Sequence, residues 1–516
     1  MRFDRRSGVL LHPTALPGSH GIGDLGAGAR SFIDFLDRAD QSIWQVCPLG
    51  PTVGIHGHSP YQTFSGFAGN PLLIDLVDLA DRGYLTEAEI DPGGGDAATD
   101  AVDGNPGQDA GDGPDFSPHE VRYDAVESFK LGRLRIAFER FREVASDDEL
   151  AAFAEFRDRE GDWLADYALF RALKREFDGT LWTEWPEPAR TRDLDALADY
   201  RDDLADEVDF RAFCQWAFDR QWRDLRADAA DRGVEILGDL PIYVALDSAD
   251  VWAAPAAFDL TDDGRPAAVA GVPPNMGDTG QRWGNPVYDW DRLAESGYRW
   301  WLDRLSRLFD MVDYARLDHF KGFDEFWAIP DDSDDPADGE WREGPGNAFF
   351  EAVREEFGRL PFVAENLGFL DAGSAALREA FDLPGMRVPQ YADWCQQGHM
   401  YQPMHYPEDC VAYTSTHDTD TAVGYYESLG ERQRDCLHYN LGTDGGEIEW
   451  DLVEAVWNSE ATLAVTTMQD LLGLDSHARF NTPGTTDGNW RWRVTGAGLD
   501  DAVADRLARI TDATVR

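Results

Sequence analysis

The run Val312-Asp-Tyr-Ala-Arg-Leu-Asp318 decides which fold class this sequence favours. It is a short stretch of apolar and β-forming residues, and it ends in an acidic side chain before a turn. Other runs share this design, so each is a candidate strand. They are Gly8–His12, Ile43–Leu49, Val234–Pro241, Phe362–Asn366, Met386–Tyr391, Val411–Asp418 and Ala478–Gly484.

Stretches with helical periodicity separate most of these candidate strands. Ala27–Ala39 and Trp300–Phe309 are examples. Alternation of strands and helices predicts parallel strands and an α/β fold, and about eight strands favour a closed (β/α)8 TIM barrel over an open sheet. Several candidates carry polar residues at their carboxyl ends, where barrel enzymes place their chemistry.

We expect residues 1–516 to form a single domain, because barrels with insertions often reach this length. Residues 84–232 are predicted to be an inserted segment. Its part 91–118 is rich in Gly, Asp and Pro without apolar periodicity, which predicts a disordered loop, and 120–231 is predicted to be helical.

The charge balance is strongly acidic. Asp and Glu number 98 against 46 Lys and Arg, for a net charge of −52, and lysine occurs only at Lys130, Lys174 and Lys321. Such a field repels nucleic acid and anionic membrane surfaces, so neither is expected as a partner. Because concentrated salt screens this self-repulsion, we predict a halophilic protein that works in a high-salt cytoplasm.

Five scattered cysteines, Cys47, Cys214, Cys395, Cys410 and Cys436, form no CxxC pair. An odd number without a framework predicts free thiols in a reducing compartment. The sequence shows no secretory apolar segment and no run long enough to span a bilayer, so a cytoplasmic location is expected.

Three acids, Asp318, Glu365 and Asp418, each close a candidate strand. Most acids in so acidic a chain are solvated surface residues, but an acid at the end of an apolar strand has buried neighbours. Side chains alternate along a strand, so Arg316 shares a face with Asp318 and favours its ionised form. A structural salt bridge is the alternative interpretation of that pair.

The run Phe362-Val-Ala-Glu365 places a glutamate in an apolar setting, which should raise its pKa and retain its proton. An ionised carboxylate and a protonated one, roughly 5–5.5 Å apart, are the requirement of a retaining glycosidase.

Longer motifs carry a resemblance to a known family. They include Gly8-Val-Leu-Leu-His-Pro-Thr-Ala-Leu-Pro17, Trp44-Gln-Val-Cys-Pro-Leu-Gly-Pro51, Ser59-Pro-Tyr-Gln62, Gly238-Asp-Leu-Pro-Ile-Tyr-Val244, Gly280-Gln-Arg-Trp-Gly-Asn-Pro286, the three acid motifs and Gly488-Asn-Trp490. In this order they resemble the amylomaltase or 4-α-glucanotransferase family, glycoside hydrolase family 77, nearly from end to end.

The resemblance implies a nucleophile at Asp318, a general acid/base at Glu365 and a stabiliser of the transition state at Asp418. It also implies an active-site loop region at 51–75 and α-1,4-glucan or maltooligosaccharide substrates. The substrate-binding residues that it implies are Tyr61, Asp239, Trp283, Asn285, Arg316, His319 and His417.

The chain departs from the family pattern in places. Asn366 and Lys321 stand where the family usually has Asp and Arg, and Thr419 stands where it usually has Asn. None of these changes removes a predicted catalytic carboxylate.

Two further patterns do not predict cofactors. Gly21-Ile-Gly-Asp-Leu-Gly26 fits GxGxxG, but it does not follow its strand directly, as a dinucleotide site requires. His56 and His58 have no placed third ligand, so no metal is expected. The alternatives to a transferase are a glucan hydrolase or debranching enzyme with the same acids, and a catalytically silent glucan-binding barrel. Oligomeric state and product length are not predicted.

Overall fold

The computed structural model describes residues 4–93, 114, 116–275, 279–368 and 371–516. Its centre is an eight-stranded sheet with the order β10-β11-β12-β1-β2-β3-β6-β9, and every pairing in it is parallel. The strands are β1 (Arg6–Leu10), β2 (Ile43–Gln45), β3 (Glu235–Leu240), β6 (Tyr314–Leu317), β9 (Phe362–Ala364), β10 (Gly385–Arg387), β11 (Cys410–Tyr413) and β12 (Leu463–Thr467).

The two ends of this sheet meet, so the sheet closes into a barrel. The N–H of Ala364 in β9 donates to the Pro384 carbonyl just before β10, at 2.9 Å. The Met386 N–H in β10 donates to Oδ1 of Asn366, at 2.8 Å. The predicted (β/α)8 barrel is therefore confirmed, and no open edge is left at this seam.

The prediction of a strand at Ala478–Gly484 was wrong. The segment Ala478–Gly484 begins at the end of a short 3-10 helix and continues as loop, and the eighth barrel strand is instead β12, earlier in the chain. β12 is buried on both faces, as a central parallel strand must be.

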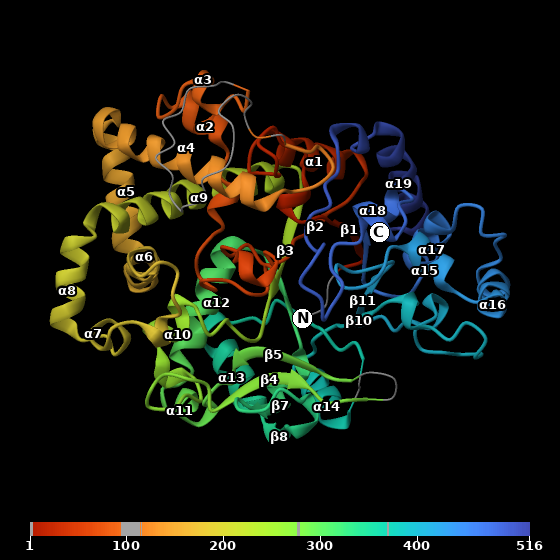
Figure 1. Ribbon diagram of the computed structural model, residues 1–516. Helices are drawn as coiled ribbons and strands as arrows, with labels where there is room; N and C mark the ends of the chain where they lie inside the picture. Colours follow the sequence, from red (N-terminus) through yellow and green to blue (C-terminus); the bar gives the residue numbers. More distant parts are fainter. Residues whose placement is uncertain (1–3, 94–113, 115, 276–278, 369–370) are drawn as a thin grey trace.

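Helices surround the barrel in Figure 1, as the alternating pattern predicted. These helices are α1 (Ala27–Arg38), α9 (Ala205–Asp231), α11 (Trp290–Glu295), α12 (Arg299–Met311), α13 (Gly346–Phe357), α14 (Ala372–Ala380), α15 (Ala422–Ser428), α16 (Glu431–Leu441), α17 (Ile448–Trp457), α18 (Met468–Leu471) and α19 (Asp501–Thr514). Most of them bury apolar side chains in the core shared with the strands, whereas Leu437 of α16 lies in a second, smaller cluster with Trp394, Ala422, Ile448 and Leu452.

Between β2 and β3 the chain leaves the barrel and forms a group of helices, seen at the upper left of Figure 1. The predicted disordered loop at 91–118 lies largely outside the described residues. Besides α9, the helices between β2 and β3 are α2 (Leu76–Asp81), α3 (Glu87–Ile90), α4 (Tyr123–Val144), α5 (Asp147–Arg159), α6 (Gly161–Glu176), α7 (Glu187–Arg190) and α8 (Leu194–Asp203). The short α10 (Ala249–Ala253) follows β3.

A second sheet was not predicted. It is antiparallel, with the order β5-β4-β7-β8, and lies at the bottom of Figure 1. Its strands are β4 (Ala268–Val272), β5 (Gln281–Pro286), β7 (Glu325–Pro330) and β8 (Glu340–Glu343). Trp283 of β5 contacts His319, two residues beyond the end of β6, so this sheet reaches the carboxyl end of β6.

The expectation of free thiols is corrected for two of the five cysteines. Cys395 and Cys436 form a disulfide between the segment after β10 and helix α16, whereas Cys47, Cys214 and Cys410 are free and buried. The pair is 41 residues apart in sequence, so only the folded chain brings it together.

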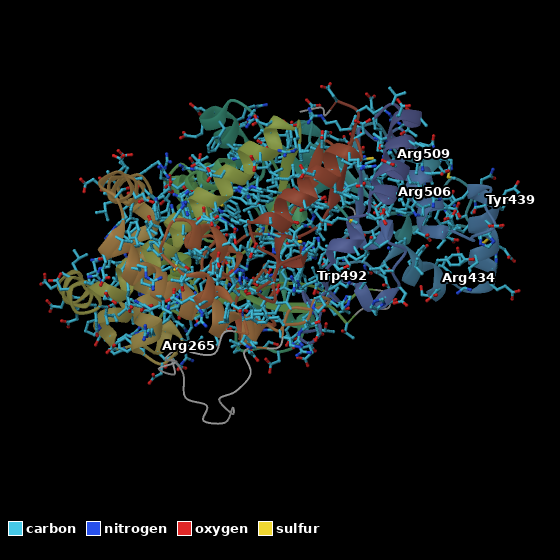
Figure 2. All side chains as sticks on the ribbon, turned by 90° about the horizontal axis from the view of Figure 1, so that it is seen from above. Arg265, Arg434, Tyr439, Trp492, Arg506 and Arg509 are labelled. Atoms are coloured by element: carbon cyan, nitrogen blue, oxygen red, sulfur yellow. A yellow bond between two sulfur atoms is a disulfide. The ribbon has the colours of Figure 1, made fainter. Side chains whose placement is uncertain are left out.

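All three lysines are withdrawn from the surface into ion pairs. Lys130 pairs with Asp24, Lys174 with Asp247, and Lys321 with Glu325 and Asp371. Arginines supply the exposed cations among the described residues; Arg265 and Arg506, both labelled in Figure 2, pair with Asp263 and Glu447.

Within the described part of the chain, no helix combines the length and the apolar character that crossing a bilayer demands.

Candidate active site

The register of β3, β6 and β9 places the first acidic residues of the site beside one another. Asp239 in β3 pairs with Arg316 in β6, and Leu317 in β6 pairs with Ala364 in β9. Asp318 and Glu365 are the next residues along β6 and β9, so they stand level with each other. Neighbouring strands lie about 4.8 Å apart and level residues of parallel strands face the same side, so both carboxyl groups face one space.

Arg316 connects two carboxylates. Its Nη1 lies 2.9 Å from Oδ1 of Asp318 and 2.8 Å from Oδ2 of Asp239. Asp239 and Arg316 are buried, whereas the Asp318 side chain is 28% exposed. Asp239 therefore serves as a buried counter-ion to Arg316, while Asp318 pairs with the same cation and stays accessible to a ligand.

Glu365 has the opposite environment. Burial raises its pKa to about 7, and the neighbouring Asp318 carboxylate adds to the rise, against the opposing effects of Arg316 and two backbone N–H groups. Those N–H groups belong to His319 and Leu367, at 3.1 and 2.6 Å. The pKa of Glu365 is raised, as expected, so a large share of this carboxyl group is still protonated near neutral pH, where an ordinary glutamate is fully ionised.

His319 adopts a left-handed backbone conformation with φ of 50°, which is uncommon outside glycine. This conformation ends β6 sharply and directs the His319 N–H at Glu365. The imidazole is then placed edge-on to Trp283, with ring centroids 4.9 Å apart. Burial lowers the pKa of His319 to about 4, so the ring is neutral at working pH.

Asp418 was predicted to lie at the end of its strand, but it lies five residues beyond the end of β11. Asn481 donates to its Oδ1 at 2.6 Å, and His417 Nε2 lies 3.2 Å from its Oδ2. Burial alone would raise the pKa of Asp418, but His417 and the other donors outweigh it and hold that pKa well below its usual range. A third carboxylate is thus ionised and partly exposed.

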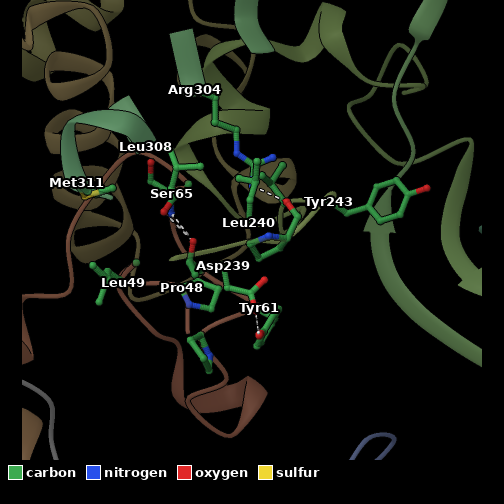
Figure 3. Close-up of a pocket in the computed structure, with 17 residues that line it drawn as sticks. Pro48, Leu49, Tyr61, Ser65, Asp239, Leu240, Tyr243, Arg304, Leu308 and Met311 are labelled. Atoms are coloured by element: carbon green, nitrogen blue, oxygen red, sulfur yellow. Dashed lines mark hydrogen bonds between the residues drawn. The ribbon is translucent and has the colours of Figure 1, made fainter. Parts of the chain in front are cut away.

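Tyr61 connects the ion-paired residues around Arg316 with His417 and Asp418. Its hydroxyl donates to Oδ2 of Asp239 at 2.9 Å, as Figure 3 shows, and lies 2.8 Å from His417 Nε2. Its ring stacks on His417, with centroids 5.3 Å apart, and Trp490 packs beside both.

The remaining two predicted residues come from β5. Trp283 is partly exposed and contacts His319, and Asn285 is buried and accepts a hydrogen bond from Gln62 at 2.8 Å. Since Gln62 follows Tyr61, Asn285 steadies the loop that carries Tyr61. The structure therefore links every residue of the predicted site to this carboxylate cluster.

Sequence reasoning missed several supporting residues. Arg479 and Asn481 hold the backbone and side chain of Asp418, and they lie in the segment mistaken for a strand. Asp470, fully buried, accepts hydrogen bonds from Thr414 and Ser415 and braces the loop that leads to Asp418. The motif around Trp490 was the one sequence signal that pointed to this region.

Two departures from the family pattern have defined places. Asn366 accepts a hydrogen bond from β10 at the barrel seam, a role in which an amide oxygen replaces a carboxylate oxygen. Lys321 lies 4.3 Å from the centre of the Trp341 ring and pairs with Glu325 and Asp371, beside the site. Neither one displaces a carboxyl group of the site.

A parallel barrel with accessible carboxyl groups gathered at the carboxyl ends of its strands defines a barrel enzyme of the carbohydrate-processing class. The sequence profile of a family described as 4-alpha-glucanotransferase matches residues 11–499. The chain belongs to that family.

Comparison with individual proteins gives the same family. The 4-alpha-glucanotransferase of Thermus thermophilus is 43% identical over 525 residues and covers 100% of both chains. That of Synechocystis sp. is 42% identical, over 99% of this chain and 98% of its own. Among solved structures, the amylomaltase of Streptococcus agalactiae in complex with acarbose superimposes with a TM-score of 0.91, at 35% identity and 99% coverage of each chain.

Proposed function

We propose that the protein is a retaining 4-α-glucanotransferase that moves α-1,4-glucan segments from one maltooligosaccharide or glucan to the 4-hydroxyl of another. Glucose is released when the acceptor side of the donor is a single sugar. The observation that carries the proposal is the level placement of Asp318 and Glu365 at the ends of neighbouring strands. Asp318 forms an ion pair with Arg316, and Glu365 has a pKa of about 7.

In the first step, a carboxylate oxygen of Asp318 attacks the anomeric carbon of the donor. The bond from that carbon to the glycosidic oxygen breaks, and Glu365 gives its proton to the departing oxygen. The donor segment is left as a β-linked ester on Asp318. In the second step, the Glu365 carboxylate takes the proton of the acceptor 4-hydroxyl, whose oxygen displaces Asp318. Two inversions restore the α-linkage.

The other residues shape the sugar that reacts. Asp418 is proposed to hold the sugar hydroxyls at the cleavage position and favour a flattened ring, with His417 beside it. Tyr61 offers its ring face to the sugar, while Asp239 and Arg316 hold Asp318. Trp283, Asn285 and His319 border the cleft on the side of β5. These steps need side chains alone, with no metal or cofactor.

The names of the relatives support transfer over hydrolysis, and the related Streptococcus agalactiae amylomaltase was solved with acarbose. Transfer exceeds hydrolysis when an acceptor hydroxyl is held against the ester and water is excluded, because proximity then outweighs the concentration of water. Trp283 and Tyr61 supply the apolar surfaces for that purpose.

Maltotriose provides the test of the function. The purified protein, assayed in concentrated KCl, should convert maltotriose into glucose and a ladder of longer maltooligosaccharides, resolved by chromatography. Products that only shorten would identify a glucan hydrolase or debranching enzyme. Unchanged maltotriose and longer maltodextrins, together with measurable glucan binding, would identify a silent binding barrel.

We also propose that the protein works as one catalytic domain in a high-salt cytoplasm. A net charge of −52 supports this proposal, as does the pairing of every lysine with an acid, with two of the three lysines buried. The melting temperature should rise by at least about 10 °C between about 0.1 and 2 M KCl, because the Debye length falls from roughly 10 Å to below 3 Å.

The measurement is thermal unfolding followed by circular dichroism over a series of KCl concentrations. A 4-alpha-glucanotransferase with a net charge close to zero is the control. A melting temperature that does not change with KCl would show that surface repulsion is not the reason for the acidic composition.

A further inference from the structure

The hydroxyl group of Tyr61 lies between two groups that are otherwise separate. Oδ2 of Asp239 is 2.9 Å away on one side, and Nε2 of His417 is 2.8 Å away on the other. Figure 3 shows the contact with Asp239, in a small pocket that Tyr61 and Asp239 both line. The ring is held by His417 and Trp490, so the position of the hydroxyl is fixed.

The chemistry of the partners decides where the protons lie. A tyrosine hydroxyl has one proton to donate, and an ionised carboxylate can only accept. Tyr61 therefore donates to Asp239 and accepts from His417, which must carry its proton on Nε2. The same Nε2–H lies 3.2 Å from Oδ2 of Asp418, so the imidazole serves both oxygen atoms.

The chain of contacts continues on the other side of Asp239. Arg316 donates to both oxygens of Asp239, at 2.9 and 2.8 Å, and contacts Oδ1 of Asp318 at 2.9 Å. An unbroken series of hydrogen bonds and ion pairs thus leads from Asp418 through His417, Tyr61, Asp239 and Arg316 to Asp318. Tyr61 is the uncharged member at its centre.

We propose that the Tyr61 hydroxyl is a positioning group that fixes Asp418 and Asp318 relative to each other, a role separate from contact between its ring and a sugar. The inference rests on the proposed glucan transfer. In this proposal the hydroxyl oxygen of Tyr61 couples Asp318, the carboxylate that attacks, to Asp418, the carboxylate that holds the sugar.

Loss of this hydroxyl has a predictable electrostatic effect. The hydrogen bond from Tyr61 helps to keep Asp239 ionised against burial, so removing it raises the pKa of Asp239. A protonated Asp239 no longer balances Arg316, which is then free to shift toward Asp318. The titratable and charged groups that act on Asp239 or are acted on by it are Arg316, Asp318, His417, Tyr61, Cys47 and Tyr413.

The variant Tyr61→Phe tests the proposal, because phenylalanine keeps the ring and loses only the hydroxyl. We expect kcat with maltotriose to fall about tenfold, which corresponds to roughly 1.4 kcal/mol, while KM changes by less than about twofold. The acid limb of the pH profile of kcat should move to higher pH, because Asp239 takes up its proton more readily.

Tyr84→Phe is the matched control. Tyr84 is also buried and also donates to a carboxylate, Glu149, but it lies on the helical insertion and has no contact with the site. It should lose some stability and keep the wild-type kcat and pH profile. Equal losses of kcat in Tyr61→Phe and Tyr84→Phe, or an unchanged pH profile of kcat in Tyr61→Phe, would overturn the proposal.

A second measurement does not depend on activity. In a nitrogen-15 NMR titration, the pKa of His417 should fall in Tyr61→Phe, because its Nε2–H has lost an acceptor, and His417→Gln identifies the signal. An unchanged His417 titration would refute the coupling. A wild-type protein that fails to disproportionate maltotriose would instead refute the proposed function, and the titration would still decide the coupling.

Discussion

Replacing Asp318 with asparagine is expected to lower kcat for maltotriose disproportionation by roughly 10⁴-fold or more. The amide is nearly the same size as the carboxylate but cannot form the ester with the anomeric carbon. Arg316 keeps its buried partner Asp239, at 2.8 Å, so the fold should be retained. The measurement is the initial rate of glucose release, with circular dichroism to verify folding.

Asp313→Asn is the matched control for that experiment. Asp313 immediately precedes β6 at the opposite end of the strand, where it pairs with Arg226 and accepts from the Ile236 N–H. Its replacement should reduce stability and leave kcat within a few fold of the wild type. A comparable loss of kcat in both variants would mean that the role of Asp318 is structural.

Glu365→Gln should reduce kcat by about 10²- to 10⁴-fold, the usual contribution of a general acid and base. Glu365 has a pKa of about 7 and must be protonated to donate, so wild-type activity should decline as pH rises through that value. Glutamine does not titrate. The residual activity of the variant should therefore lack this basic limb in a profile of kcat/KM against pH.

A donor with a good leaving group separates the two roles. α-Glucosyl fluoride needs no proton from the enzyme in the first step, so Glu365→Gln should form the glucosyl ester from it at a rate close to that of the wild type. Asp318→Asn should not, because its missing group is the nucleophile. Disproportionation of maltotriose that survives in Glu365→Gln with its basic limb intact would refute the assignment of the acid/base.

The barrel could be predicted because parallel strands buried on both faces leave a local signal. The seven correct strands are apolar runs that end in polar residues or turns, and in the structure several are shorter than predicted, such as β2 and β10. Leu463–Thr467 was missed because it lies between helices α17 and α18, with α18 starting at the next residue. An apolar run in such a place cannot be told from a helix by periodicity.

The antiparallel sheet and the disulfide were missed for a related reason. The pairing of β4 with β7 and the disulfide of Cys395 with Cys436 join segments that lie far apart in the chain, and nothing in either segment alone specifies the other. The loop with Arg479 and Asn481 was mistaken for a strand because its role depends on Asp418, about sixty residues away.

The sequence alone placed Asp318 and Glu365 at the ends of their strands, and it placed Asp318 on the same strand face as Arg316. Backbone alternation and burial are local properties, so a single stretch of chain encodes them. The tertiary structure decided what the acids do to one another. The register of β6 with β9 set Glu365 level with Asp318, and packing brought Tyr61, His417 and Asn481 to the other carboxylates. Those relations depend on long-range packing, which exists only when the whole barrel has closed.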